Sequence, residues 1–171
     1  MSKFSGGGKL VPKPNAKAIM TGFIGGFVGI LSLALLTNWS GYPLLMAPFG
    51  ATCVILFTAA AAPFAQPRNV IGGHFISALV GLVALYFFGQ GPIIMAFAVA
   101  TAIAAMQFLR VVHPPAGANP LVILMAGSAG FDFLLLPVLV GSIVLVGVAA
   151  VINNAQAESK WPIYWLGSDK E

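Results

Sequence analysis

The sequence has little charge and almost no cysteine. Charged residues make up 7% of its 171 residues, whereas soluble domains carry about 25%. The single cysteine, Cys53, lies within a hydrophobic stretch, which excludes a disulfide framework. Basic residues form no face beyond the N-terminus, so nothing indicates nucleic-acid binding. The two histidines and the cysteine are far apart in the sequence, and we expect no enzyme, no metal site and no cofactor.

Acidic residues are missing from every hydrophobic segment. Asp132 lies at the edge of a segment, and Glu158, Asp169 and Glu171 lie near the C-terminus. Cation pathways through membranes usually show buried carboxylates or rings of carbonyl groups. The absence of buried carboxylates therefore favours an anion as the transported ligand.

Apolar residues, in contrast, make up 59% of the chain, and the mean hydropathy is +0.97. A membrane-spanning helix needs about 20 predominantly apolar residues. We therefore predict an all-α membrane protein. Its six hydrophobic segments are residues 18–37, 43–62, 70–88, 92–109, 111–128 and 133–152.

Basic residues obey the positive-inside rule if all six segments cross and the N-terminus is cytoplasmic. Residues 1–17 then form a basic cytoplasmic segment, and residues 18–152 form the transmembrane domain. Residues 153–171 form a cytoplasmic interfacial tail with an aromatic anchor at residues 161–165. Arg68 and Arg110 lie on the same side as both termini. Re-entrant second and fifth segments would put both arginines outside. Six crossings are therefore favoured, and re-entrance stays open as the alternative.

Two short stretches share the pattern Pro-x-Gly-Ala-[Thr/Asn]. Residues 48–52 interrupt the second segment, and residues 115–119 interrupt the fifth. Glycine- and proline-interrupted segments at matching positions in two halves point to a transport site. Because each half, residues 18–88 and 92–152, contains three segments, we predict two inverted repeats. Segments two and five are then broken into half-helices, one from Pro48 to about Ala62 and the other from Pro115 to about Gly127.

Opposed half-helices would bring two helix N-termini together near the centre of the membrane. Each N-terminus has unpaired N–H groups and about half a positive charge, which suits an anion. Glycine in each copy leaves the amides open to close approach. The predicted binding residues are Pro48, Phe49, Gly50, Ala51 and Thr52 in the first copy, and His113, Pro114, Pro115, Ala116, Gly117, Ala118 and Asn119 in the second.

Several polar residues are candidates for the pathway. His113 binds the anion as imidazolium, relays a proton, or caps backbone exposed by the two prolines, and these roles remain open. An inter-helix hydrogen bond is the favoured role for His74. Arg68 and Arg110 lie at the inner mouths, where they attract anions or only determine topology. The second role is favoured for Arg68.

The string HPPAGA at residues 113–118 resembles the signature of the HPP family of small integral membrane proteins. The resemblance covers residues 18–152. That family is usually described with four transmembrane helices, and the two broken segments account for the difference from six. A plant chloroplast-envelope relative is associated with nitrite transport, so the resemblance implies a small-anion carrier or channel. Because no transit peptide is present, we expect a bacterial inner membrane.

We therefore predict transport of a small monovalent anion, nitrite or nitrate, by a chain surrounded by the lipid bilayer. The alternative is a non-transporting membrane sensor or partner subunit. The first segment carries two interleaved G-x-x-x-G pairs, Gly22 with Gly26 and Gly25 with Gly29. Small residues of this kind let helices approach closely. Internal packing is their favoured role, and a homo-oligomer contact is the second.

Overall fold

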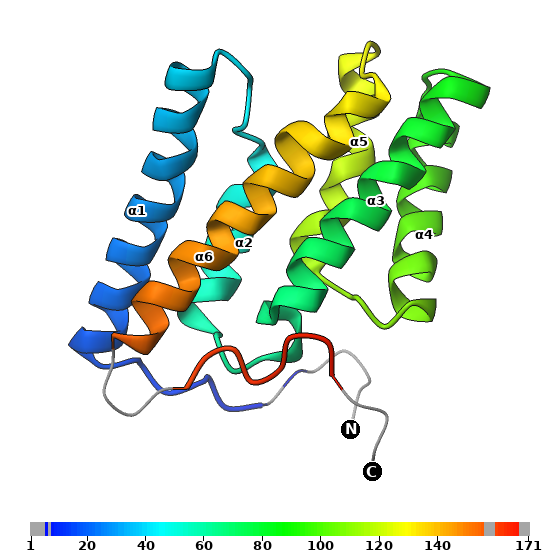
Figure 1. Cartoon of the computed structure of the whole chain (residues 1–171). Coiled ribbons are helices and arrows are strands. Elements are labelled where there is room, and N and C mark those ends of the chain that lie inside the picture. The colour runs from blue at the N-terminus through cyan, green and yellow to red at the C-terminus, as the bar shows by residue number, and fades with distance from the viewer. Residues whose placement is uncertain (1–5, 7, 156–159, 168–171) are drawn as a thin grey trace.

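The computed structural model describes residue 6, residues 8–155 and residues 160–167 (Figure 1). Parts of the predicted N-terminal segment and tail, residues 1–5, 7, 156–159 and 168–171, lie outside the described residues. No strand occurs among the described residues, so the predicted all-α fold is confirmed. The α-helices are α1 Ala16–Ser40, α2 Ala47–Thr58, α3 Pro67–Phe88, α4 Pro92–Phe108, α5 Asn119–Ala126 and α6 Val140–Asn154.

Three stretches are long and apolar enough to cross a membrane. They are Ala16–Ser40, Pro67–Phe88 and Phe131–Asn154, with 25, 22 and 24 residues. The last includes two short turns, Phe131–Leu134 and Leu135–Leu139, that lead into α6. The three stretches correspond to the predicted first, third and sixth segments, and α4 corresponds to the fourth. The fold is therefore that of a membrane protein, and the inverted relation of its halves stays a prediction.

α2 is a short helix that follows extended backbone, as expected for a broken segment. Pro48 occupies its first turn, where the missing N–H of proline costs nothing. The helix ends at Thr58 rather than at residue 62, so its predicted end is wrong. Pro63 holds Ala62 in an extended conformation, and the chain turns through Pro63–Ala65 into α3.

The fifth segment differs from the single helix predicted to begin at Pro115. A 3-10 turn spans Pro114–Ala118, and α5 begins only at Asn119. It ends where Gly127 adopts a left-handed φ of 70°. Pro120 has no N–H to donate to the Ala116 carbonyl, and its ring crowds that carbonyl, so a regular α-helix that began at Pro115 could not continue through this position. In Figure 1, α2 runs downward behind α6, whereas α5 runs upward.

α1 packs against α2 and α6 through one of its two glycine pairs. A Cβ atom at Gly25 would overlap the ring of Phe57, and one at Gly29 would lie 3.2 Å from the Leu145 side chain. This pair therefore serves packing within the bundle, the role favoured from the sequence. A Cβ atom at Gly26, in contrast, would meet nothing within 4 Å.

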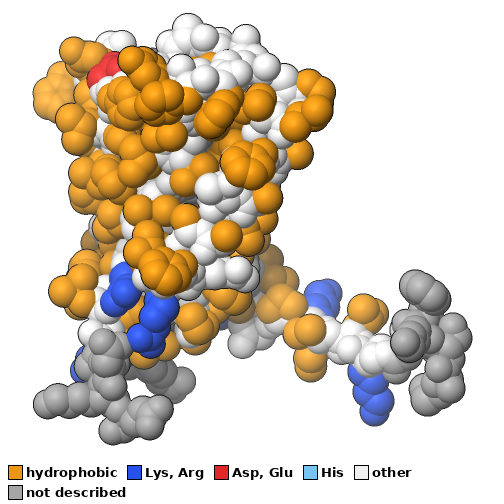
Figure 2. Space-filling model, turned by 90° about the vertical axis from the view of Figure 1, so that its right-hand side faces the viewer, with side chains coloured by type: hydrophobic (Ala, Val, Ile, Leu, Met, Phe, Trp, Pro, Cys, Tyr) orange, Lys and Arg blue, Asp and Glu red, His pale blue; other side chains and the backbone are white. Residues whose placement is uncertain are grey.

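Charge distinguishes the two ends of the molecule. Lys and Arg side chains gather at the end where α1 begins and α6 ends, and an acidic side chain lies at the opposite end (Figure 2). In the described part of the chain that acidic residue is Asp132. Residues 160–167 lie across the basic end, where Trp161 is buried and pairs with Asn154. Trp161 thus packs into the bundle, although the sequence predicted a membrane anchor.

Candidate functional site

Four buried polar side chains meet between α2, α3 and the fifth segment. Thr52 lies on α2, His74 on α3, His113 just before the turn, and Asn119 at the start of α5. Each is 0% exposed. Thr52 Oγ1 lies 2.8 Å from His74 Nε2 and 2.9 Å from His113 Nε2. His74 Nδ1 lies 3.1 Å from Asn119 Nδ2. We call these four side chains the buried polar chain.

One hydrogen bond fixes the direction of the buried polar chain. His113 Nδ1 lies 2.7 Å from the carbonyl oxygen of Phe64, which can only accept, so Nδ1 carries the proton. In neutral His113 the other nitrogen, Nε2, then accepts from the Thr52 hydroxyl. Thr52 in turn accepts from His74 Nε2–H, and His74 Nδ1 accepts from the Asn119 amide. Every donor of the neutral chain therefore points toward Phe64.

The repeated motif contributes one member of the buried polar chain from each copy. Thr52 and Asn119 occupy the same motif position, and they bind the two ring nitrogens of His74. Asn119 Nδ2 also donates to the backbone carbonyl of His74 at 2.9 Å. His74 makes the inter-helix hydrogen bond that the sequence favoured, and through it the two copies of the motif are joined.

Glycines on α3 let the irregular fifth segment approach closely. A Cβ atom at Gly73 would lie 2.7 Å from the His113 Cβ and 2.8 Å from the Val111 carbonyl oxygen. A Cβ atom at Gly81 would lie 2.8 Å from the Cα of Pro120. Real Cβ atoms essentially never come this near to another heavy atom. Only glycine therefore fits at these two positions without moving the fifth segment.

Polar side chains on α3 also satisfy the backbone of the fifth segment. Ser77 Oγ donates to the Ala116 carbonyl at 2.6 Å, and Asn69 Nδ2 donates to the Val112 carbonyl at 2.9 Å. Irregular backbone at membrane depth is tolerated only where protein or a wet cavity satisfies it. The Ala116 carbonyl also accepts from the Asn119 N–H of the same stretch, so the contacts from α3 add to the partners that the stretch has within itself.

The two half-helix N-termini offer fewer unpaired amides than the sequence predicted. The Phe49 N–H donates to the Met46 carbonyl at 3.0 Å, and the Ala116 N–H donates to the His113 carbonyl at 3.0 Å. The prolines at positions 48, 114, 115 and 120 have no N–H. Side chains of the buried polar chain, rather than backbone amides, are therefore the main polar groups here.

The predicted binding residues divide into a buried group and a group that is exposed or half-buried. The buried ones are Pro48, Phe49, Thr52, His113, Pro115, Ala116 and Asn119. Gly50, Ala51 and Pro114 are exposed, whereas Gly117 and Ala118 are half-buried. A Cβ atom at either motif glycine would meet nothing within 4 Å, so the backbone there is open to approach. The structure thus brings together the polar residues of both copies, whereas Gly50 and Ala51 of the first copy face outward.

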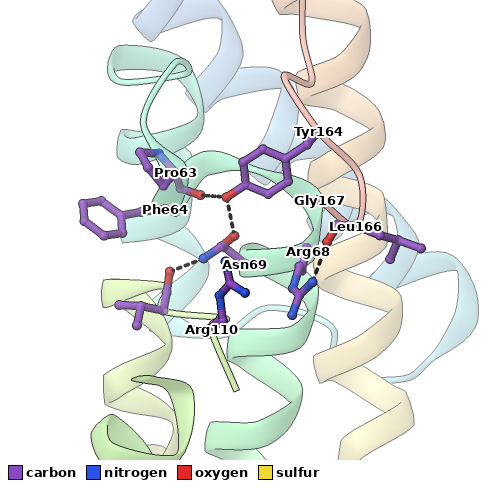
Figure 3. A pocket seen from close by; sticks show the side chains of 9 residues that line it. Pro63, Phe64, Arg68, Asn69, Arg110, Tyr164, Leu166 and Gly167 are labelled. Carbon is purple, nitrogen blue, oxygen red and sulfur yellow. Dashed lines mark hydrogen bonds between the residues drawn. The ribbon is translucent and has the colours of Figure 1, made fainter. Parts of the chain in front are cut away.

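A pocket of about 510 Å³ lies at the basic end of the molecule (Figure 3). Arg68 and Arg110 line it together, although they come from segments far apart in the sequence. Arg68 donates to the backbone carbonyls of Leu109 and Leu166. Arg110 has a left-handed φ of 58°. The two predicted pathway arginines thus share one pocket.

The pocket adjoins the buried polar chain through two of its lining residues. Phe64 lines the pocket, and its backbone carbonyl is the partner of His113 Nδ1. Val112 also lines the pocket and immediately precedes His113 in the chain. A ligand in the pocket would therefore lie next to the residues that hold His113.

Sequence reasoning missed three polar residues at the basic end. Tyr164 Oη donates to Asn69 Oδ1 at 2.9 Å, and Gln66 Oε1 accepts from the Ile163 N–H at 2.8 Å. Gln66 and Asn69 flank Arg68 at the start of an apolar segment, and this position was a usable signal. Tyr164 reaches the pocket through the fold of residues 160–167, which no local pattern indicates.

Comparison with known proteins identifies the family. Residues 11–162 match the family model described as HPP, transmembrane region. The chain belongs to the HPP family. The resemblance predicted from residues 113–118 is therefore confirmed, and the matched range includes all of α1 to α6.

Two curated relatives of this HPP protein come from Dictyostelium discoideum, and each is described as a transmembrane protein. One is 34% identical over 174 residues, which cover 95% of this chain and 56% of the relative. The other is 36% identical over 172 residues, which cover 94% and 60%. The chain thus spans less than two thirds of the length of these relatives. No solved structure matches it.

The His-Pro-Pro string of this HPP protein lies where the pocket and the buried polar chain meet. His113 is a member of the buried polar chain, and Pro114 and Pro115 begin the turn that leads to α5. Two residues that line the arginine pocket, Arg110 and Val112, come immediately before the string in the sequence. The family motif thus connects a charged pocket with a buried, hydrogen-bonded pair of imidazoles.

Proposed function

We propose that this HPP protein transports a small monovalent anion across the membrane, with nitrite and nitrate as the leading substrates. The pocket lined by Arg68 and Arg110 is the observation that carries the proposal. An anion in this pocket would lie beside Phe64, whose carbonyl holds His113. The proposed activity is transport without chemical conversion, and it involves no cofactor and no metal ion.

Electrostatics support an anion rather than a cation. Arginine stays protonated in proteins, and a cleft lined by charges of one sign concentrates ions of the other sign. Asp132 is the one acidic residue in the part of the chain that the structure describes, and it lies at the end opposite the pocket (Figure 2). A cation entering the pocket would therefore meet two guanidinium groups and no carboxylate in its lining.

The shape of the guanidinium group supports a planar oxyanion. Arginine presents N–H groups in a planar fork that binds two oxygens of one anion. Nitrite, nitrate and formate each present two or more oxygens in a plane, whereas chloride cannot use this geometry. We therefore expect the planar oxyanions to be preferred over chloride.

The proposal includes the orientation of the protein in the membrane, its cellular location and its oligomeric state. The positive-inside rule puts the basic end on the cytoplasmic side, so residues 1–17 and 153–171 are cytoplasmic. The inner membrane of a bacterium remains the proposed location. The outward face of α1 at Gly26 offers room for a second copy of the chain, which would make the transporter a homo-oligomer.

Uptake by proteoliposomes tests the proposed function. The reconstituted chain is expected to give saturable uptake of nitrite and nitrate above that of empty vesicles, with slower chloride uptake and no uptake of sodium or potassium. Faster cation than anion uptake would contradict the proposal. Anion uptake equal to that of empty vesicles would also contradict it, and would favour the alternative, a non-transporting sensor or partner subunit.

Substitutions in the pocket test whether it binds the anion. The double variant Arg68→Gln, Arg110→Gln is expected to raise the nitrate concentration for half-maximal uptake about tenfold, which corresponds to ~1.4 kcal/mol. The matched control is the double variant Lys9→Gln, Lys13→Gln, which removes two exposed positive charges outside the pocket and should change nothing. Equal effects of the two variants would show that overall charge, and not the pocket, determines uptake.

A further inference from the structure

The buried polar chain places two imidazoles on either side of one hydroxyl group. We propose that it binds one proton, and that this proton crosses the membrane together with the anion. The inference rests on the proposed anion transport and adds its co-substrate. Each member of the buried polar chain has hydrogen-bond partners for both a neutral and a protonated state.

In the neutral state the hydrogen bonds run in one direction along the chain. The Asn119 amide donates to His74, His74 donates to Thr52, and Thr52 donates to His113. The last bond runs from His113 Nδ1 to the Phe64 carbonyl. The donor–acceptor distances lie between 2.7 and 3.1 Å, which are normal for good hydrogen bonds.

An added proton finds partners within the same set of residues. When His113 is protonated at Nε2, Thr52 accepts there, and its hydroxyl donates to the Pro48 carbonyl 3.1 Å away. When His74 is protonated at Nδ1, the Asn119 side chain offers its carbonyl oxygen, Oδ1, 3.3 Å from that nitrogen. Either imidazolium thus keeps its N–H groups paired, as a buried cation requires.

Transfer of the proton between the two histidines is balanced. The His74 Nε2–H bond breaks as a new Thr52 O–H bond forms, and the original Thr52 O–H bond breaks as a His113 Nε2–H bond forms. His74 keeps its Nδ1–H and becomes neutral, while His113 becomes the imidazolium. Thr52 Oγ1 lies within 2.9 Å of both nitrogens, so no heavy atom has to move far.

The surroundings give a protonated histidine no fixed negative partner. The helices and turns packed against the buried polar chain carry, besides its histidines, the titratable or charged residues Lys17, Cys53, Arg68, Tyr86 and Asp132. Cys53 faces α1, and Lys17, Tyr86 and Asp132 are exposed. Arg68 and the neighbouring Arg110 carry the same sign as the imidazolium. The transported anion is then the charge that stabilises the proton, so each ligand favours binding of the other.

Proton movement during nitrate uptake tests the inference. Nitrate is the suitable probe because nitric acid is fully dissociated in water and does not carry protons across lipid as a neutral acid. Proteoliposomes with a trapped pH-sensitive dye are expected to acidify inside, with about one proton per nitrate. Nitrate uptake without acidification would overturn the proton site and leave anion transport standing.

Variants of Thr52 make the test specific. Thr52→Val keeps the shape and removes the hydroxyl that joins the two imidazoles. It is expected to lower the proton-to-nitrate ratio by about fivefold or more, because the hydrogen bonds to both rings are lost. Thr52→Ser should restore the ratio. The matched control is Thr58→Val on the same helix, where the exposed hydroxyl bonds the Val54 carbonyl, and its ratio should be that of the parent chain. An unchanged ratio in Thr52→Val would overturn the inference.

Nitrogen NMR tests the proton site without any flux. The sequence has two histidines, so an untagged, histidine-labelled chain gives ring signals from these alone. At alkaline pH we expect one ring protonated at Nδ1 and the other at Nε2, and the pair should take up about one proton on acidification. The same tautomer in both rings, or no proton uptake, would overturn the site even if nitrate is transported. If the NMR signals are as expected but the chain takes up no anion, the proposed function and the co-transport are refuted. The proton site would stand in that case.

Discussion

Gly73 lies where any larger residue would collide with the segment that carries His113. A Cβ atom there would come within 3.0 Å of both the His113 side chain and the Val111 backbone. His113 reaches Thr52 only because the fifth segment lies this close to α3. The buried polar chain therefore depends on position 73 having a hydrogen atom where any other residue has a Cβ atom.

Gly73→Ala is accordingly expected to destabilise the protein by about 1–3 kcal/mol, as overpacking of a core does. Thermal unfolding in detergent measures this loss. The matched control is Gly147→Ala in α6, where a Cβ atom would meet nothing within 4 Å. That change should leave stability unchanged or raise it by up to about 1 kcal/mol, since alanine favours helix. Equal stability of the two variants would show that the close approach at Gly73 is not required.

The sequence predicted the residues of the buried polar chain better than their contacts. Thr52, His113 and Asn119 were expected at a shared binding site, and His74 was expected in an inter-helix hydrogen bond. The sequence does not show that His74 and His113 meet at one hydroxyl, because their contact depends on the rotation and register of three separate segments. Hydropathy carries no information about either quantity.

At the scale of elements, hydropathy predicted the segments, and prolines decided where helices begin and end. The long spans agree with the predicted first, third and sixth segments. The predicted end of α2 was wrong because Pro63 turns the chain. The predicted start of the fifth helix was wrong because Pro120 cannot donate to the Ala116 carbonyl. Residues 160–167 were expected at the membrane interface, yet Trp161 packs into the bundle through contacts remote in sequence.

Gln66 connects residues 160–167 with the turn between α2 and α3. Its side chain is buried, donates to the carbonyls of Ala60 and Ala62, and accepts from the Ile163 N–H. Gln66→Leu removes the side-chain partner of the Ala60 carbonyl and of the Ile163 N–H, at about 1–3 kcal/mol for each buried group, whereas the Ala62 carbonyl keeps the Ala65 N–H. We expect faster hydrogen–deuterium exchange in peptides that cover residues 160–167. The matched control is Gln107→Leu at an exposed site on α4, and equal exchange in both variants would contradict the role of Gln66.

At the scale of the whole molecule, side chains of opposite charge lie at opposite ends of the helix bundle. Basic side chains occupy one end, and Asp132 occupies the other (Figure 2). The membrane field and lipid charge act on such a molecule as a whole, which is why the positive-inside rule predicts one orientation. In that orientation the arginine pocket opens to the cytoplasm.

Labelling of introduced cysteines tests the orientation. Ser128 lies near the Asp132 end and Lys160 lies at the basic end, and both are exposed. An impermeant maleimide is expected to label Ser128→Cys in intact cells. It is expected to label Lys160→Cys only after the membrane is broken. The native Cys53 is buried and serves as an internal control. The reverse pattern would place the arginine pocket on the outer side.

The position of a bound anion is the most direct measurement of all. Crystals grown with bromide are predicted to show anomalous density in the pocket between Arg68 and Arg110, and nitrate should displace it. Bromide bound only at the Asp132 end or on lipid-facing surfaces, or bromide that nitrate does not displace, would contradict the anion site on which the proposed transport depends.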